Sequence, residues 1–260
     1  MTKLILTRHG QSTWNAENRF TGWVDVDLSD KGIGEAEKSG QIIKDLNIKI
    51  DISYTSYLKR AIKTLTSILK KNNLELKFNT AWQLNERHYG SLTGLNKKET
   101  KQKIGEDLFK KYRRSWDIAP PPIEEKSEYQ NSFSPLNASI PVGMTPFTES
   151  LKDTYNRVVP FYEDEIKKNL LDNKNILISA HGNSLRALCK YLFNISDTKI
   201  NELEIPTGNP LVIEFDNNLV INKYYYLDET RAKTIIFNQV VPNIIHRKYF
   251  IFYRAEITLI

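Results

Sequence analysis

Two histidines at the ends of apolar segments are the residues in this sequence best placed to do chemistry. Residues 4–10 read LILTRHG and residues 176–182 read ILISAHG, so His9 and His181 each stand between an apolar run and a glycine. Neutral imidazole is a nucleophile near neutral pH, and a second imidazole can bond to phosphoryl oxygens as their charge builds. For one histidine alone, a hydrogen-bonded strand-end residue is the simpler interpretation. The repeated pattern, in two of only four histidines, favours one shared site.

Cationic and acidic side chains elsewhere could complete such a site. Arg8 precedes His9, Arg60 falls early in a predicted helix, and Arg113 and Arg114 are adjacent. The planar guanidinium group suits phosphate and carboxylate ligands, although each arginine alone could equally be a surface residue. Glu86 lies in a stretch dense in titratable groups and could act as a general acid and base. In isolation it could also be an ordinary turn carboxylate.

The elements that must position these residues alternate between strands and helices. Apolar runs predict strands over residues 4–7, 50–54, 175–180, 211–215 and 224–227. Helical periodicity and a Ser29 N-cap predict helices over residues 31–44, 56–71, 97–113, 151–169 and from 182 to 193. This alternation predicts an α/β fold, in which a sheet carries helices on both faces. Ligands of such sheets bind beyond the carboxyl ends of the strands, where both histidines stand.

Two segments lie outside this regular pattern. Residues 119–146 are rich in proline and serine, which predicts a long surface excursion or lid within one catalytic domain over residues 1–228. Residues 229–260 form an apolar, aromatic and basic tail. Exposure of such a tail would invite association. We therefore expect it to pack on the body away from the site, in preference to a subunit contact or a poorly ordered state.

Composition excludes several classes of protein. Cys189 is the only cysteine, which rules out internal disulfides and cysteine metal clusters, and no His-x-x-x-His pair supports a zinc site. The net charge is +6, but the excess lies mainly in residues 231–260, which argues against nucleic-acid binding. No apolar run is long enough to span a membrane, and the N-terminal residues show no signal peptide. These features predict a cytoplasmic protein.

The motifs, taken in order, resemble the histidine phosphatase superfamily and, more narrowly, its bisphosphoglycerate-dependent phosphoglycerate mutases. Arg-His-Gly alone indicates only the superfamily. The narrower resemblance rests on RHGQSTWN at residues 8–15, FTGW at 20–23, LNERHYG at 84–90, GLNK at 94–97, YRRS at 112–115, AHGNSLR at 180–186 and IPTG at 205–208. It covers residues 1–228, with a weak stretch at 127–145 and a departure in the tail.

The resemblance implies a role for each matching residue. His9 would be the phosphorylated histidine, His181 the histidine that stabilises the transferring phosphoryl group, and Glu86 the proton donor and acceptor. The groups that would hold the transferring phosphate or line its pocket are Arg8, Ser12, Asn15, Arg60, His181, Gly182 and Asn183. Those that would bind the rest of the substrate are Thr21, Gly22, Arg87, Tyr89, Lys97, Arg113 and Arg114. Gly10, Gln11, Thr13, Trp14 and His88 are further substrate-binding candidates.

The same resemblance implies a three-layer α/β/α sandwich with a mostly parallel sheet, and commonly a homodimer. The expected activity is interconversion of 3- and 2-phosphoglycerate in glycolysis and gluconeogenesis, primed by 2,3-bisphosphoglycerate without a metal. A phosphatase or bisphosphoglycerate synthase on the same scaffold is the nearest alternative, and relative rates distinguish them. Retention of His9, Glu86 and His181 together argues against a catalytically silent binding protein.

Overall fold

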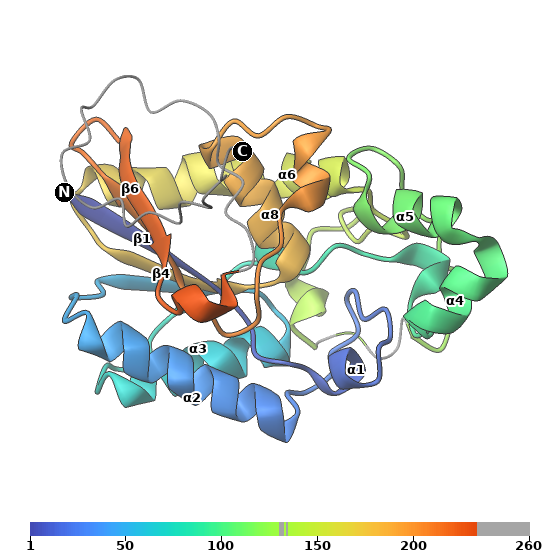
Figure 1. Ribbon diagram of the computed structural model, residues 1–260, viewed down its shortest axis with the longest axis horizontal. Coiled ribbons are helices and arrows are strands. Elements are labelled where there is room, and N and C mark those ends of the chain that lie inside the picture. The colour runs from blue at the N-terminus through green and yellow to red at the C-terminus, as the bar shows by residue number, and fades with distance from the viewer. Residues whose placement is uncertain (130–132, 134, 233–260) are drawn as a thin grey trace, which may run out of the picture.

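The structure is a computed structural model that describes residues 1–129, 133 and 135–232 (Figure 1). Within these residues, six strands form one sheet in the order β3-β2-β4-β1-β5-β6. The strands are β1 (Thr2–Arg8), β2 (Ile52–Thr55), β3 (Asn79–Thr80), β4 (Ile176–Ala180), β5 (Leu211–Phe215) and β6 (Ile221–Tyr226). The α-helices are α1 (Thr13–Ala16), α2 (Asp30–Asp45), α3 (Lys59–Lys71), α4 (Lys97–Ile104), α5 (Glu106–Arg114), α6 (Leu151–Phe161), α7 (Lys167–Leu171) and α8 (Gly182–Leu192).

The sheet is mostly parallel, as predicted. β1, β2, β3 and β4 run parallel, whereas β5 and β6 add an antiparallel edge. β1 pairs directly with β4, in a register that places Arg8 opposite Ala180. The two strands therefore end side by side, and the residues that follow them, His9 and His181, leave the sheet at the same point.

Helices cover both faces of the sheet, which confirms the three-layer arrangement. In Figure 1, α2 and α3 lie on one side of the sheet and α6 and α8 on the other. Side chains alternate along β1 accordingly: Ile5 packs with Ile43 and Leu65 from the α2–α3 layer, while Leu4 and Leu6 belong to the cluster that includes α6 and α8. All three β1 side chains are buried.

Most predicted elements are present with shifted boundaries. Ser29 caps α2 as expected, because its Oγ accepts the N–H of Gly32. The single helix predicted over residues 97–113 is wrong, since Gly105, with φ +81°, separates α4 from α5. The helix predicted over residues 151–169 continues from α6 through a π-helical turn, Tyr162–Ile166, into α7. The short elements α1 and β3 were not predicted.

The Pro- and Ser-rich excursion packs against the site end of the molecule where it is described. The Tyr129 ring stands edge-on to Trp14 and closely covers Gly94, and Phe133 contacts Trp23. Positions 130–132 and 134 lie outside the described residues, as do residues 233–260, so the packing expected of most of the tail is untested. Each helix in the described part of the chain is too short or too polar to cross a lipid bilayer.

Candidate active site

His9 and His181 meet at the centre of the candidate site. The His9 N–H donates to the Ala180 carbonyl across the β1–β4 pair at 3.0 Å, and the two rings lie 4.9 Å apart, centroid to centroid. Nδ1 of His9 lies 2.6 Å from the Gly10 carbonyl oxygen. A carbonyl only accepts, so Nδ1 carries the proton of the neutral ring and Nε2 keeps a lone pair. His9 is therefore held in the tautomer of a nucleophile.

Burial and neighbouring charge keep both rings neutral. Burial lowers the pKa of His9 well below its ordinary value, and the charges of Arg60 and Arg8 lower it further. Burial is also the largest cause of the lowered pKa of His181, and the charges of Arg60 and His9 lower it further. Nε2 of His181 is 2.7 Å from the Ser56 hydroxyl, a contact that sequence reasoning missed. At neutral pH the site thus offers two uncharged imidazoles.

Two arginines beside His9 supply positive charge. Arg8 donates to the Ile205 carbonyl at 2.9 Å. Arg60, only 1% exposed, donates to the carbonyls of Val24 and Gly22, each at 2.8 Å. The Nε groups of both arginines are buried and have no protein partner within the described residues. Burial lowers the pKa of Arg60 to about 10, so it remains protonated at neutral pH.

Glu86 faces the same cavity with one carboxylate oxygen held. Its Oε1 accepts the backbone N–H of Arg87 at 2.8 Å and that of Asn183 at 3.1 Å. The second donor, Asn183, is the second residue of α8, in the first turn, where helix N–H groups have no intrahelical partner. Within the part of the chain that the structure describes, the other oxygen, Oε2, accepts no hydrogen bond, which suits an acid and base.

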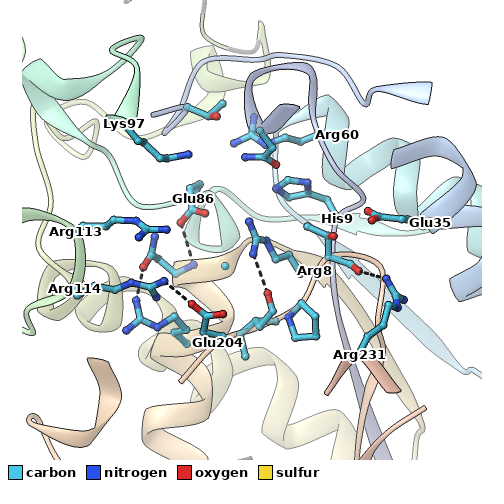
Figure 2. Close-up of a pocket in the computed structure, with 18 of the residues that line it drawn as sticks. Arg8, His9, Glu35, Arg60, Glu86, Lys97, Arg113, Arg114, Glu204 and Arg231 are labelled. Atoms are coloured by element: carbon cyan, nitrogen blue, oxygen red, sulfur yellow. Dashed lines mark hydrogen bonds and ion pairs between the residues drawn. The ribbon is translucent and has the colours of Figure 1, made fainter. Parts of the chain in front are cut away.

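The wall opposite His9 is cationic. Figure 2 shows Lys97, Arg113 and Arg114 on one side of the cavity, His9, Arg8 and Arg60 on the other, and Glu86 between them. The cavity measures about 510 Å³. Burial is the largest cause of the lowered pKa of Lys97 and of Arg113. Arg114 is paired with Glu204 at 2.8 Å. The arrangement suits a small molecule with negative charge at both ends.

The structure brings most of the predicted site residues to this cavity. They come from the end of β1 and the turn after it, from α1, and from the loops before α2 and before η2, which is a 3₁₀ turn over Gly90–Leu92. The others come from the first residues of α3, α4 and α8 and the last of α5. The predicted residues that line the cavity are Arg8, His9, Asn15, Thr21, Arg60, Glu86, Tyr89, Lys97, Arg113, Arg114, Gly182 and Asn183.

Several other predicted residues stand behind that lining. Gly10 packs so closely on α2 that a Cβ atom there would lie 2.1 Å from the Gly32 carbonyl oxygen. Ser12 caps α1 by accepting the Asn15 N–H, and Gly22 offers Arg60 its carbonyl. His181 is buried, and its ring meets the His9 ring edge-on. Gln11, Thr13 and Trp14 of the first motif are also predicted site residues outside the lining.

Arg87 and His88 also lie outside the lining. The Arg87 guanidinium donates to the carbonyls of Tyr112 and Arg113 at 3.0 and 3.1 Å, which joins the Glu86 loop to the end of α5. His88 is buried, and its Nδ1 accepts the Gly90 N–H at 3.0 Å. Burial lowers the pKa of His88 to about 4. Arg87 and His88 thus hold the loop that carries Glu86 in place from behind the cavity.

Sequence reasoning missed part of the lining, namely Glu35, Arg186, Glu204, Ile205, Pro206, Thr207, Thr230 and Arg231. Arg186 and residues 205–207 fall within the quoted motifs, so a signal existed for them. Glu35 and Arg231 carry no motif and reach the cavity only through folding. Arg231 lies within the predicted tail, and donates to the Thr207 and Gly208 carbonyls at 3.1 and 2.8 Å. The first described residues of the tail therefore approach the site.

Among the described residues, no three His, Cys, Asp or Glu side chains gather as metal ligands.

The sequence profile of the histidine phosphatase superfamily (branch 1) matches residues 4–141 and, in a second segment, 124–225. The chain therefore belongs to the histidine phosphatase superfamily. Its relatives narrow this class.

Curated relatives with high identity carry one name, 2,3-bisphosphoglycerate-dependent phosphoglycerate mutase. The protein of Pelagibacter ubique is 55% identical over 236 residues, which cover 91% of this chain and 99% of the relative. That of Treponema denticola is 53% identical, with 90% and 96% covered, and that of Lactobacillus johnsonii, mutase 1, is 51% identical, with 86% and 98% covered. These identities place the chain among the 2,3-bisphosphoglycerate-dependent phosphoglycerate mutases.

Solved structures share the fold at much lower identity. A mycobacterial glucosyl-3-phosphoglycerate phosphatase superposes with a TM-score of 0.66 at 18% identity, over 87% of this chain and 97% of that one. Bacillus stearothermophilus YhfR gives a TM-score of 0.63 at 21% identity, with 85% and 95% covered. These likenesses concern the fold alone.

Proposed function

We propose that this chain is an isomerase of class EC 5.4.2.11 that interconverts 3-phosphoglycerate and 2-phosphoglycerate, in glycolysis and gluconeogenesis, through a phosphohistidine at His9. The relatives supply the reaction and the substrates. The observation that carries the mechanism is the His9 ring, which is buried, neutral and held with Nε2 free beside two arginines.

His9 acts as the phosphoryl carrier. Its Nε2 lone pair attacks phosphorus while the Nδ1–H bond to the Gly10 carbonyl stabilises the positive charge that the ring gains. Arg8 and Arg60 have unpartnered Nε groups at this point, suited to the phosphoryl oxygens. The His181 ring, which packs edge-on against that of His9, is assigned to stabilise the same group as it is transferred.

Glu86 moves the proton of the substrate hydroxyl. When the phosphoryl group leaves His9 for that hydroxyl, Oε2 of Glu86 takes the proton, and in the reverse direction it returns it. The two N–H bonds to Oε1 fix the carboxylate in place for both directions. The bisphosphoglycerate formed in this way then reorients, and its other phosphoryl group passes to the Nε2 of His9 while Glu86 returns the proton to the oxygen that is released. One group can serve both steps because this second transfer is the chemical reverse of the first at the other position of the substrate.

The cationic wall binds the end of the substrate that does not react. Lys97, Arg113 and Arg114 suit its carboxylate and second anionic group, with Tyr89 and Thr21 beside them. The cavity and its cations also fit 2,3-bisphosphoglycerate, which supplies the phosphoryl group that primes His9. The unpartnered Nε atoms of the two arginines beside His9 are the buried donors that such a polyanion would satisfy.

An assay of 3- to 2-phosphoglycerate conversion, with and without added 2,3-bisphosphoglycerate, tests the proposal. We expect the priming compound to raise turnover strongly in enzyme first stripped of phosphate, and to leave it unchanged when His9 is replaced by asparagine. Full activity of unprimed enzyme would contradict the assigned cofactor. Turnover should also survive exhaustive EDTA treatment, and activity that returned only with Mn²⁺ would contradict the proposed metal-free mechanism.

The resemblance to the mutases also supports a homodimer in the cytoplasm, with residues 1–228 as the catalytic domain. Light scattering on the purified protein tests the oligomeric state, and a mass of one chain would contradict it. Truncation after Asp228 tests the domain limit. Because Arg231 donates to the carbonyls of Thr207 and Gly208 beside the site, truncation should also lower activity.

A further inference from the structure

A buried ion pair lies behind the loop that carries Glu86. Glu149 immediately precedes the N-cap of α6, and Arg157 follows two turns later on the same helix. Nε of Arg157 is 2.6 Å from Oε1 of Glu149, and Nη2 is 2.9 Å from Oε2. Their side chains are 7% and 4% exposed. Neither residue lines the cavity, so neither touches the substrate.

The remaining donors of Arg157 all go to the backbone around Glu86. Nη1 donates to the carbonyls of Gln83 and Asn85 at 2.6 and 3.0 Å, and Nη2 donates to the carbonyl of Glu86 itself at 3.0 Å. The five N–H groups of the guanidinium are thus all used, two on the carboxylate and three on this loop.

Glu149 holds the other side of Glu86. Its Oε2 accepts the His88 N–H at 2.7 Å, and its own backbone N–H donates to the His88 carbonyl at 2.9 Å. The pair therefore fixes the chain both before and after Glu86, where residues 85–89 are neither helix nor strand. A capping box between Ser150 and Asp153 anchors the start of α6, where Glu149 lies.

The net stabilisation from this ion pair does not by itself explain why the pair is buried here. Desolvation of two charges offsets much of their attraction, so a buried ion pair is weak evidence of stabilisation. Its bonds here converge on one short segment whose single cavity-facing carboxylate must meet a substrate hydroxyl. A general acid and base works only within hydrogen-bond reach of the proton it moves.

We propose that Arg157 and Glu149 are positioning residues that set the place of the Glu86 carboxylate for proton transfer. The inference rests on the proposed role of Glu86. Lysine at position 157 keeps the charge but has three donors at one nitrogen, so it loses the planar contact with the carboxylate and with some of the three carbonyls. A displacement near 1 Å lowers turnover by up to about 100-fold.

The test is a double-mutant cycle in full-length enzyme primed with 2,3-bisphosphoglycerate. Arg157→Lys should lower kcat at least about 10-fold with little change in KM, because the substrate-binding cations are untouched. In a Glu86→Gln background, the same substitution should change kcat less than about twofold, since the group being positioned is already disabled. Glu149→Gln, which can still accept from His88, should show the same non-additivity with a smaller loss.

Val158→Ala is the matched control, a buried neighbour on α6 that belongs to the core cluster. It should lower the Tm and leave kcat unchanged. Equal losses from Arg157→Lys with and without Glu86 would overturn the inference, as would an unchanged kcat in folded Arg157→Lys and Glu149→Gln. Full activity of Glu86→Gln alone would instead refute the proposed role of Glu86, so the two failures are distinguishable.

Discussion

Replacement of Arg60 by lysine should slow phosphoryl transfer although it keeps a positive charge beside His9. Arg60 is fully buried at the start of α3. Its two terminal nitrogens, Nη1 and Nη2, donate hydrogen bonds to the carbonyls of Val24 and Gly22. Arg60 lines the cavity, and its Nε is buried with no partner among the described residues. Lysine carries one compact ammonium group, which cannot bond to both carbonyls and also reach a phosphoryl group.

The expected loss is that of one hydrogen bond to a charged group, about 1.5–3 kcal/mol. Each 1.36 kcal/mol of transition-state stabilisation is about tenfold in rate, so kcat/KM should fall by roughly 10- to 100-fold. A parallel decrease in Tm should report the lost carbonyl bond.

Rapid-quench measurement of His9 phosphorylation by 2,3-bisphosphoglycerate isolates the step concerned. Lys59→Gln is a suitable control, because Lys59 is an exposed neighbour on α3 that does not line the cavity. It should leave the rate unchanged. A phosphorylation rate within twofold of the parent enzyme in folded Arg60→Lys would refute the phosphate role and leave Arg60 as a structural residue.

Three further substitutions test the surroundings of the site. Gly32→Ala should unfold or strongly destabilise the protein in a thermal melt, because a Cβ atom there would lie 1.9 Å from the Gln11 carbonyl oxygen; a melt like that of the parent would contradict this. His88 is held neutral, with its pKa lowered to about 4, so the folded state resists a proton that the unfolded state accepts below about pH 6.5. Stability should therefore fall by about 2 kcal/mol from this group between pH 7.5 and 5, and His88→Gln should remove that part of the pH dependence in urea unfolding; equal pH slopes would disprove it. Glu204→Gln should lower KM by about two- to fivefold, because Glu204 competes with the substrate for Arg114. The Arg114–Glu204 ion pair is partly exposed and contributes under about 1 kcal/mol. An unchanged or higher KM would show that Glu204 does not compete with the substrate.

The repeated strand-histidine-glycine pattern made the centre of the site predictable from sequence. The apolar runs at residues 4–7 and 175–180 predicted buried strands next to turns, and parallel strands of one sheet end at the same edge. The β1–β4 pairing confirms that arrangement. α2 and α3 were predictable from local sequence too, α2 from its N-cap Ser29 and α3 from its apolar stripe. The assigned roles of the individual site residues stay predictions.

Features that depend on distant contacts were beyond sequence reasoning. Glu35 lies on an exposed-looking helical pattern and reaches the cavity only because α2 packs on the turn at Gly10. Arg157 looked like one charge on an amphipathic helix, yet folding buries it against the Glu86 loop. Gly105 carried no local sign that it would break a helix with a left-handed backbone, since an isolated glycine is often tolerated there.

The phosphorylated residue is the central claim, and mass spectrometry of enzyme incubated with 2,3-bisphosphoglycerate tests it most directly. The parent protein should gain the mass of one phosphoryl group, stable in base and lost in acid, and peptide mapping should place it on His9. His9→Asn should gain none, while His88→Gln, which alters a buried histidine outside the cavity lining, should still be modified. An acid-stable adduct, or an adduct that persists in His9→Asn, would contradict the account.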